Sequence, residues 1–228
     1  MKRALLGVLL LLGLLVVVAD RVVEQVAEGV IARQLQADLG STPSVEIGGF
    51  PFLTQALRGR YGEIRVSAER LERGDVSVQD FTATLNGAQV PLSSVFEGSL
   101  DEVPVDRLEG GGLVTWAEIE AAAGDRLRLG AAGEQVRITG TVPVLGQEVE
   151  AVALADATVQ GQDLLLRATE VSVGGQPVSG VLGEAVVGAL SVTYPVPDLP
   201  YGLELRDVDI TPEGVVATGV SEGAVLRR

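Results

Sequence analysis

The chain has 228 residues, of which 46% are hydrophobic, and a formal net charge of −14 at pH 7. Such an acidic surface repels polyphosphate, so nucleic acid is not an expected partner. Cysteine and histidine are both absent. Their absence excludes disulfides, a catalytic thiol, the commonest general base and the usual transition-metal ligands, and no cofactor is expected.

The first residues carry the pattern of an export signal. A basic dipeptide precedes an apolar run from Ala4 to Ala19, which as a helix rises about 24 Å and is slightly short of the ~20 residues that a membrane span prefers. The small residue before Asp20 fits a cleavage site, whereas the continuous leucine and valine content favours an uncleaved anchor. We expect residues 1–19 to be a signal peptide or membrane anchor and residues 20–228 to form a single α+β domain.

An amphipathic helix is predicted from Asp20 to Leu39, with Asp20 as its N-cap and Gly40 at its end. Its apolar residues recur at intervals of three and four, which is the period of a helix that buries one face. This stripe is expected to pack on a sheet. Its members are Val22, Val23, Val26, Ala27, Val30, Ile31, Leu35 and Leu39.

Alternating patterns predict strands in the following part of the chain. Ile64, Val66 and Ala68 alternate with polar residues, which is typical of a half-buried strand. In two later segments the apolar phase slips, near Asp80 and near Asp207. A β-bulge at each place reconciles the two halves of the strand, so we expect a strongly bent sheet.

Two later strands are predicted to form a hairpin. Val149–Val159 and Leu164–Val173 flank a turn at Gly161, and both segments are apolar on both faces. Such strands lie either in the middle of a sandwich or between a core and a ligand cavity. Helices are predicted over 91–98, from Thr115, and over 178–190.

The segment from Gly48 to Leu53, Gly-Gly-Phe-Pro-Phe-Leu, places two of the four phenylalanines on a loop. Such rings need burial, so this loop is either a plug that closes one end of the core or a hydrophobic lip at the mouth of a lipid groove. The arginines that follow are either strand-face residues paired with glutamates or residues that contact phosphate. They are Arg58, Arg60, Arg65, Arg70 and Arg73.

Several of these motifs together resemble the LmeA family of actinobacterial envelope proteins. The similarity runs from about residue 20 to the C-terminus. It rests on the leader and amphipathic helix, Gly-Gly-Phe-Pro-Phe-Leu-Thr-Gln at 48–55, Gly-Glu-Ile-Arg-Val at 62–66, Leu-Pro-Tyr-Gly-Leu at 199–203, Val-Asp-Ile at 208–210, Glu-Gly-Val at 213–215 and Gly-Val at 219–220.

The resemblance implies a tubular lipid-binding (TULIP, BPI-like) fold, in which a strongly curved antiparallel sheet wraps a long amphipathic helix. It also implies binding of phospholipid, especially of the phosphatidylinositol type, and support of lipomannan or mannan elongation. The implied location is the outer, periplasmic side of the cytoplasmic membrane, with the protein anchored or secreted. No catalytic residue is carried over from the family, and the chain is not expected to be an enzyme.

A groove that holds an acyl chain needs a continuous apolar lining. Two rival functions stay open: an envelope scaffold that binds a membrane glycosyltransferase without carrying lipid, and a glycan-processing enzyme that uses two carboxylates. The predicted lining residues are Phe50, Phe52, Leu53, Leu57, Val181, Leu182, Val186 and Leu190, and Arg58 and Arg60 are expected nearest the headgroup.

Overall fold

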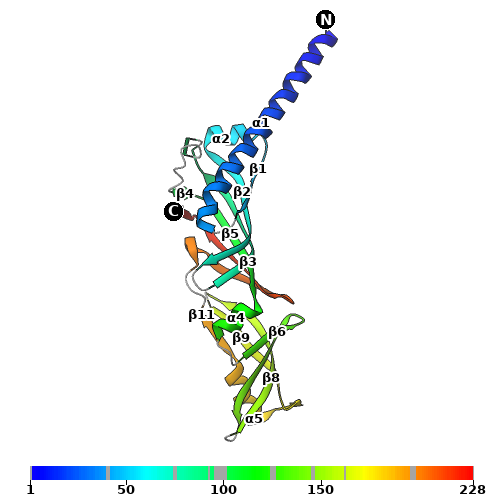
Figure 1. Ribbon diagram of the computed structural model, residues 1–228, viewed down its shortest axis with the longest axis vertical. Helices are drawn as coiled ribbons and strands as arrows, with labels where there is room; N and C mark the ends of the chain where they lie inside the picture. The colour runs from blue at the N-terminus through cyan, green and yellow to red at the C-terminus, as the bar shows by residue number, and fades with distance from the viewer. Residues whose placement is uncertain are drawn as a thin grey trace. The chain divides into compact units, whose positions relative to one another are not determined.

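The computed structural model describes residues 2–39, 42–73, 76–91, 93–94, 102–123, 127–144, 147–161, 163–195 and 199–227 (Figure 1). The fold is α+β, with a long N-terminal helix and antiparallel strand pairs, as predicted. The chain forms two compact units. Unit 1 comprises Met1–Glu69, Thr82–Glu109 and Ser221–Arg228, and unit 2 comprises Arg70–Phe81 and Gly110–Val220.

Within the described residues, fourteen strands form three sheets. The first has the order β1 (Ser44–Gly48), β2 (Arg60–Arg73), β3 (Val76–Gln89), β5 (Arg107–Thr115), β13 (Gly214–Glu222), β12 (Glu204–Ile210). The second has the order β10 (Gln176–Pro177), β9 (Asp163–Val173), β8 (Gln147–Gln160), β7 (Gln135–Val144), β6 (Leu127–Ala132), and β11 (Val192–Pro195) also pairs with β9. The third pairs β14 (Val225–Arg227) with β4 (Glu102–Pro104).

The helices are α1 (Lys2–Leu39), α2 (Phe52–Arg58), α4 (Trp116–Ala123) and α5 (Gly180–Leu190), with a 3-10 turn η1 (Pro200–Gly202). Helices α4 and α5 confirm the predictions from Thr115 and over 178–190. Most of the helix predicted over 91–98 lies outside the described residues. Among the residues that the structure describes, no helix combines the length and hydropathy needed to cross a membrane.

Helix α1 runs without a break through the end of the apolar run, so the predicted N-cap role of Asp20 within this helix is wrong. The predicted apolar stripe is also wrong at its start, because Val22 and Val26 are 53% and 51% exposed, whereas Asp20 and Glu24 are buried. The reason is the surface that α1 meets. Helix α1 lies against β1 and α2, whose backbone N–H groups need acceptors, and the carboxylates of Asp20 and Glu28 provide them. Glu24 pairs with Arg21 on the same helix.

The alternating strand pattern is confirmed in unit 1. Ile64, Val66 and Ala68 are buried on β2, and Val45 and Ile47 are buried opposite them on β1. The register pairs Val45 with Val66 and Ile47 with Ile64. These cross-strand pairs form part of the core of unit 1.

One of the two predicted bulges is confirmed by the strand register, and the backbone is unusual at the place of the other. The register of β12 and β13 shifts between Leu205 and Asp207, which confirms the second bulge. At the first, Asp80 has a φ of 49°, a left-handed conformation that non-glycine residues rarely adopt within a strand.

The core of unit 2 lies between the second sheet and α5, which packs on β9, β8 and β7. The predicted hairpin is confirmed as β8 and β9, with Gly161 in the turn. Small side chains on β8 let the layers approach closely. The buried members of this core are Val136, Ile138, Ala151, Ala153, Ala155, Ala168, Val171 and Val186.

Close backbone contact in unit 2 requires a glycine at position 214. A Cβ atom placed there would lie 2.1 Å from the carbonyl oxygen of Val114 and 2.7 Å from Cα of Thr115. Because these are backbone atoms, β5 would have to shift. We expect Gly214→Ala to lower the free energy of unfolding by about 1–3 kcal/mol. Urea unfolding followed by the fluorescence of Trp116 measures this change, since its indole N–H donates to Pro212 at 3.1 Å.

Gly130→Ala on β6 is the matched control. A Cβ atom there meets nothing within 4 Å, so the free energy of unfolding should change by no more than about 0.5 kcal/mol. Equal effects of the two substitutions would contradict the close approach at Gly214.

Candidate functional site

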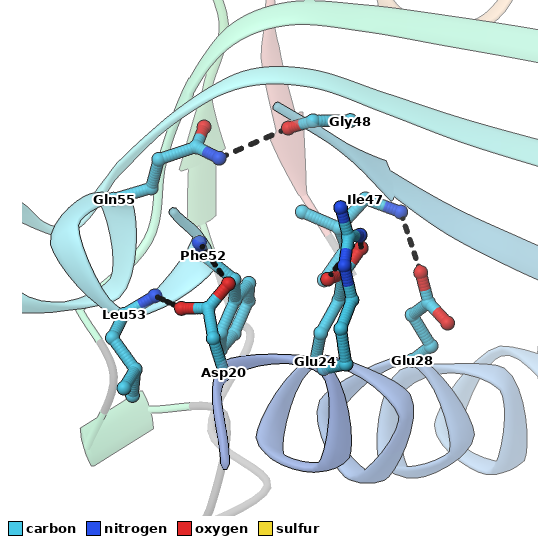
Figure 2. A network of polar contacts seen from close by, with 9 residues as sticks. Asp20, Glu24, Glu28, Ile47, Gly48, Phe52, Leu53 and Gln55 are labelled. Carbon is cyan, nitrogen blue, oxygen red and sulfur yellow. Dashed lines mark hydrogen bonds and ion pairs between the residues drawn. The ribbon is translucent and has the colours of Figure 1, made fainter. Parts of the chain in front are cut away.

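A buried carboxylate joins helices α1 and α2 in unit 1 (Figure 2). Asp20 on α1 is 1% exposed. Its two oxygens accept hydrogen bonds from the backbone N–H groups of Phe52, at 2.9 Å, and Leu53, at 2.8 Å. These donors belong to the first turn of α2, where no acceptor exists within the helix. Asp20 therefore caps α2 rather than the helix that contains it.

Two further carboxylates follow Asp20 at intervals of four along α1, so all three lie on one face. Glu28 accepts a hydrogen bond from the backbone N–H of Ile47 on β1 at 2.8 Å (Figure 2). Glu24 pairs with Arg21 at 2.8 Å, and the Arg21 guanidinium lies 5.5 Å from the ring centre of Phe50. Helix α1 is thus fastened by polar contacts to α2, to an edge strand and to the loop before α2.

Phe52 occupies the interior beneath this junction. Its side chain is fully buried, and its ring lies 6.1 Å from the ring of Tyr61. Burial raises the pKa of the Tyr61 phenol, so the ring stays neutral here. Of the two interpretations of the Gly48–Leu53 segment, the plug that closes one end of the core fits Phe52.

The segment around α2 is held at both ends. The Gln55 side chain donates to the carbonyl of Gly48 at 3.0 Å and accepts from the N–H of Gly62 at 2.8 Å. Gly59 ends α2 with a φ of 63°, and its N–H returns to Ala56 at 3.1 Å. The positive φ is the usual reason for glycine at this position. The loop and α2 are therefore linked by hydrogen bonds to β1 and β2.

The predicted lipid-contacting residues of unit 1 differ in exposure. Phe50 is 57% exposed and Leu57 is 83% exposed, whereas Leu53 is half-buried and Phe52 is buried. Phe50 and Leu57 are therefore available to an apolar ligand or surface. Phe52 is a core residue of the protein itself.

The predicted residues of unit 2 all lie on α5. Val181 is 86% exposed, and Val186 belongs to the buried core. The side chains of Leu182 and Leu190 lie outside the described part of the structure. Hence Val181 is the exposed apolar residue that this helix adds to the predicted set.

The two predicted headgroup residues have different surroundings. Arg60 pairs with Asp106, so binding phosphate through this guanidinium requires that ion pair to exchange. Arg58 is exposed at the end of α2 and makes no ion pair with the described residues. Arg65, in contrast, is a paired strand-face residue, 2.9 Å from Glu63 and 3.5 Å from Glu46. Arg58 is thus the better placed of the predicted pair.

A family model described as LmeA-like phospholipid-binding matches residues 18–220 of the chain. The chain belongs to this family. Comparisons with curated proteins and with solved structures gave no match. The resemblance inferred from the motifs is confirmed, and the family's described role is binding of phospholipid rather than catalysis. The LmeA-like match begins two residues before Asp20, so it includes the whole junction.

Sequence reasoning missed the polar face of α1 in this LmeA-like protein. Asp20, Glu24 and Glu28 recur with a spacing of four, which places them on one helix face. That spacing was the available signal, because acidic residues aligned within an otherwise apolar segment indicate partners on the neighbouring surface. It does not reveal that Asp20 and Glu28 accept from backbone N–H groups of α2 and β1, or that Glu24 pairs with Arg21.

Proposed function

We propose that the protein binds phospholipid of the phosphatidylinositol type at the outer side of the cytoplasmic membrane and supports lipoglycan elongation there. Membership of a phospholipid-binding family is the observation that carries the proposal. The implied tubular architecture, an envelope glycosyltransferase partner and the signal or anchor role of residues 1–19 belong to the same proposal.

Burial of hydrocarbon supplies the main driving force. Removing an acyl chain from water contributes roughly 0.8 kcal/mol per methylene, or on the order of 12 kcal/mol for a sixteen-carbon tail. In unit 1 the exposed side chains of Phe50 and Leu57 offer apolar surface, and Arg58, next to Leu57 in the chain, provides a cation for the anionic headgroup. Most of the surface is acidic and repels an anionic headgroup, so we expect the headgroup to bind next to an arginine such as Arg58.

Analysis of bound lipid tests this function. The full chain is purified in a mild detergent, washed and extracted with organic solvent, and the extract is examined by mass spectrometry. We expect phospholipid in the extract, enriched in phosphatidylinositol relative to the membrane of the producing cell. An extract without phospholipid would contradict the proposal.

Arg58→Glu tests the headgroup contact. A charge-assisted hydrogen bond contributes about 1.5–3 kcal/mol, so its loss should lower the recovered phosphatidylinositol about ten-fold or more. The control is Arg65→Glu, because Arg65 is equally cationic but already paired with glutamates. Equal lipid recovery from the two variants would remove Arg58 from the site.

A further inference from the structure

The exposed apolar surface of α1 ends beside α2. Large side chains from Leu10 to Val18 on this helix are exposed. Figure 1 shows α2 at the end of unit 1 from which this exposed half of α1 projects. Phe50 precedes α2 and Leu57 lies within it, and both are exposed.

The contacts of Asp20 and Arg21 fix where the start of α2 lies along the axis of α1. Asp20 directly follows the last residue of the run, and its carboxylate holds the N–H groups of Phe52 and Leu53. Arg21, the next residue, lies over the Phe50 ring. Consequently the loop and α2 begin within one residue of the point at which the run ends.

Charge at this end of unit 1 suits a phospholipid surface. Between Phe50 and Arg60 the chain carries two arginines and no acidic residue, although the whole chain has a net charge of −14. Arg58 is exposed on α2 and makes no ion pair with the described residues. Arg21 on α1 is also exposed but pairs with Glu24 at 2.8 Å, and Arg60 pairs with Asp106. Aromatic and aliphatic side chains next to arginines are typical of segments that lie in the headgroup layer, since the apolar groups enter the acyl boundary while the guanidinium groups contact phosphate.

We propose that this end of unit 1 docks on a phospholipid bilayer. The exposed apolar half of α1 enters the membrane. Phe50 and Leu57 lie at the boundary of the headgroups and acyl chains, and Arg58 contacts a phosphate. The continuity of the exposed run with this surface selects a bilayer rather than a second copy of the chain as the occupant. The inference rests on the proposed function at a membrane, and it names the surface of the protein that faces the lipid.

Single-cysteine labelling tests the docking surface, because the chain contains no cysteine of its own. Leu57→Cys, Phe50→Cys and Gln36→Cys are each prepared in the full chain and labelled with an environment-sensitive fluorophore. The labelled proteins are reconstituted into phosphatidylcholine vesicles with and without phosphatidylinositol, and quenching by nitroxide-bearing lipids is measured. Gln36 is the control, since it is exposed on the same helix about 25 Å along the axis from Ala19.

We expect the labels at positions 50 and 57 to be quenched several-fold more strongly than the label at position 36. Equal quenching at positions 57 and 36 overturns the proposal. Blue-shifted emission at position 57 that depends on protein concentration and not on lipid nitroxide also overturns it, because a second copy then covers the surface. Circular dichroism verifies folding, and Leu57 is mostly exposed, so its replacement leaves the core intact.

Lipid extraction from the unsubstituted, unlabelled full chain separates this inference from the proposed function. If the extract contains lipid but the labels are not quenched, the docking surface is rejected and lipid binding is retained. Quenched labels together with a lipid-free extract support the docking surface and reject lipid binding.

Discussion

Phe52→Ala is expected to lower the free energy of unfolding by about 3–5 kcal/mol, since truncating a buried phenylalanine removes its apolar burial and leaves a cavity. The Phe52 side chain is fully buried and packs beside Tyr61 in unit 1. Urea unfolding of the full chain in a mild detergent, followed by far-ultraviolet circular dichroism, measures the loss.

Phe50→Ala is a matched control two residues away. The chemical change is the same, but the Phe50 ring is largely exposed and lies next to the Arg21 guanidinium. A contact of this kind at the surface contributes about 0.5–1 kcal/mol, so the loss should stay near that value. Similar losses for the two variants would show that Phe52 does not fill the core of unit 1.

This pair also shows why a charge at position 52 is a poor test of lipid binding. Asp in place of Phe52 would bury an unpaired carboxylate and destabilise the unit whatever the protein binds. Leu57 and Phe50, which are exposed, separate a binding effect from a folding effect. Replacing them changes the surface that a ligand or membrane meets without opening the core.

Local pattern predicted the elements whose packing depends on local sequence. The alternation at Ile64, Val66 and Ala68 predicted a strand with one buried face, and the phase slip near Asp207 predicted a bulge, because side-chain direction in a strand follows position by twos. Both are present. Helices α4 and α5 were likewise predicted from residues within them.

Features that depend on distant partners were not predictable in this way. Asp20 has the chemistry of a helix cap, but sequence alone does not say which helix it caps, and its partner lies 32 residues further along the chain. The same limit explains Val22 and Val26, which follow the helical period and yet remain exposed. Periodicity identifies the apolar face of a helix. Whether that face is buried in the protein or left exposed depends on the elements that pack against the helix.

The predicted site residues also fall into two groups, those that are exposed and those that are buried. Phe50, Leu57, Val181 and Arg58 were selected for residue type and lie exposed. Phe52 and Val186 were selected on the same grounds and lie in the cores of their units. Exposure depends on tertiary packing, and a run such as Phe-Pro-Phe-Leu does not show which of its rings turns inward.

Asp20→Ala is expected to lower the free energy of unfolding by about 2–4 kcal/mol, because two backbone donors of α2 lose their acceptor and the Phe52 N–H is buried. Hydrogen exchange of the α2 amides should rise about ten-fold or more, since local opening of this turn becomes easier. Asp20→Asn should give an intermediate result, because the amide retains one acceptor oxygen.

The control for Asp20 is Glu46→Ala, which also removes a carboxylate from unit 1. Glu46 is exposed, and its ion pair with Arg65 is long at 3.5 Å, so its loss should change stability by no more than about 0.5 kcal/mol. If exchange at Phe52 and Leu53 is unchanged in Asp20→Ala, then the Asp20 carboxylate does not hold α2. In that event Asp20 no longer connects the position of α2 to the end of the apolar run. The geometric reason for placing Phe50 and Leu57 at a bilayer is then lost.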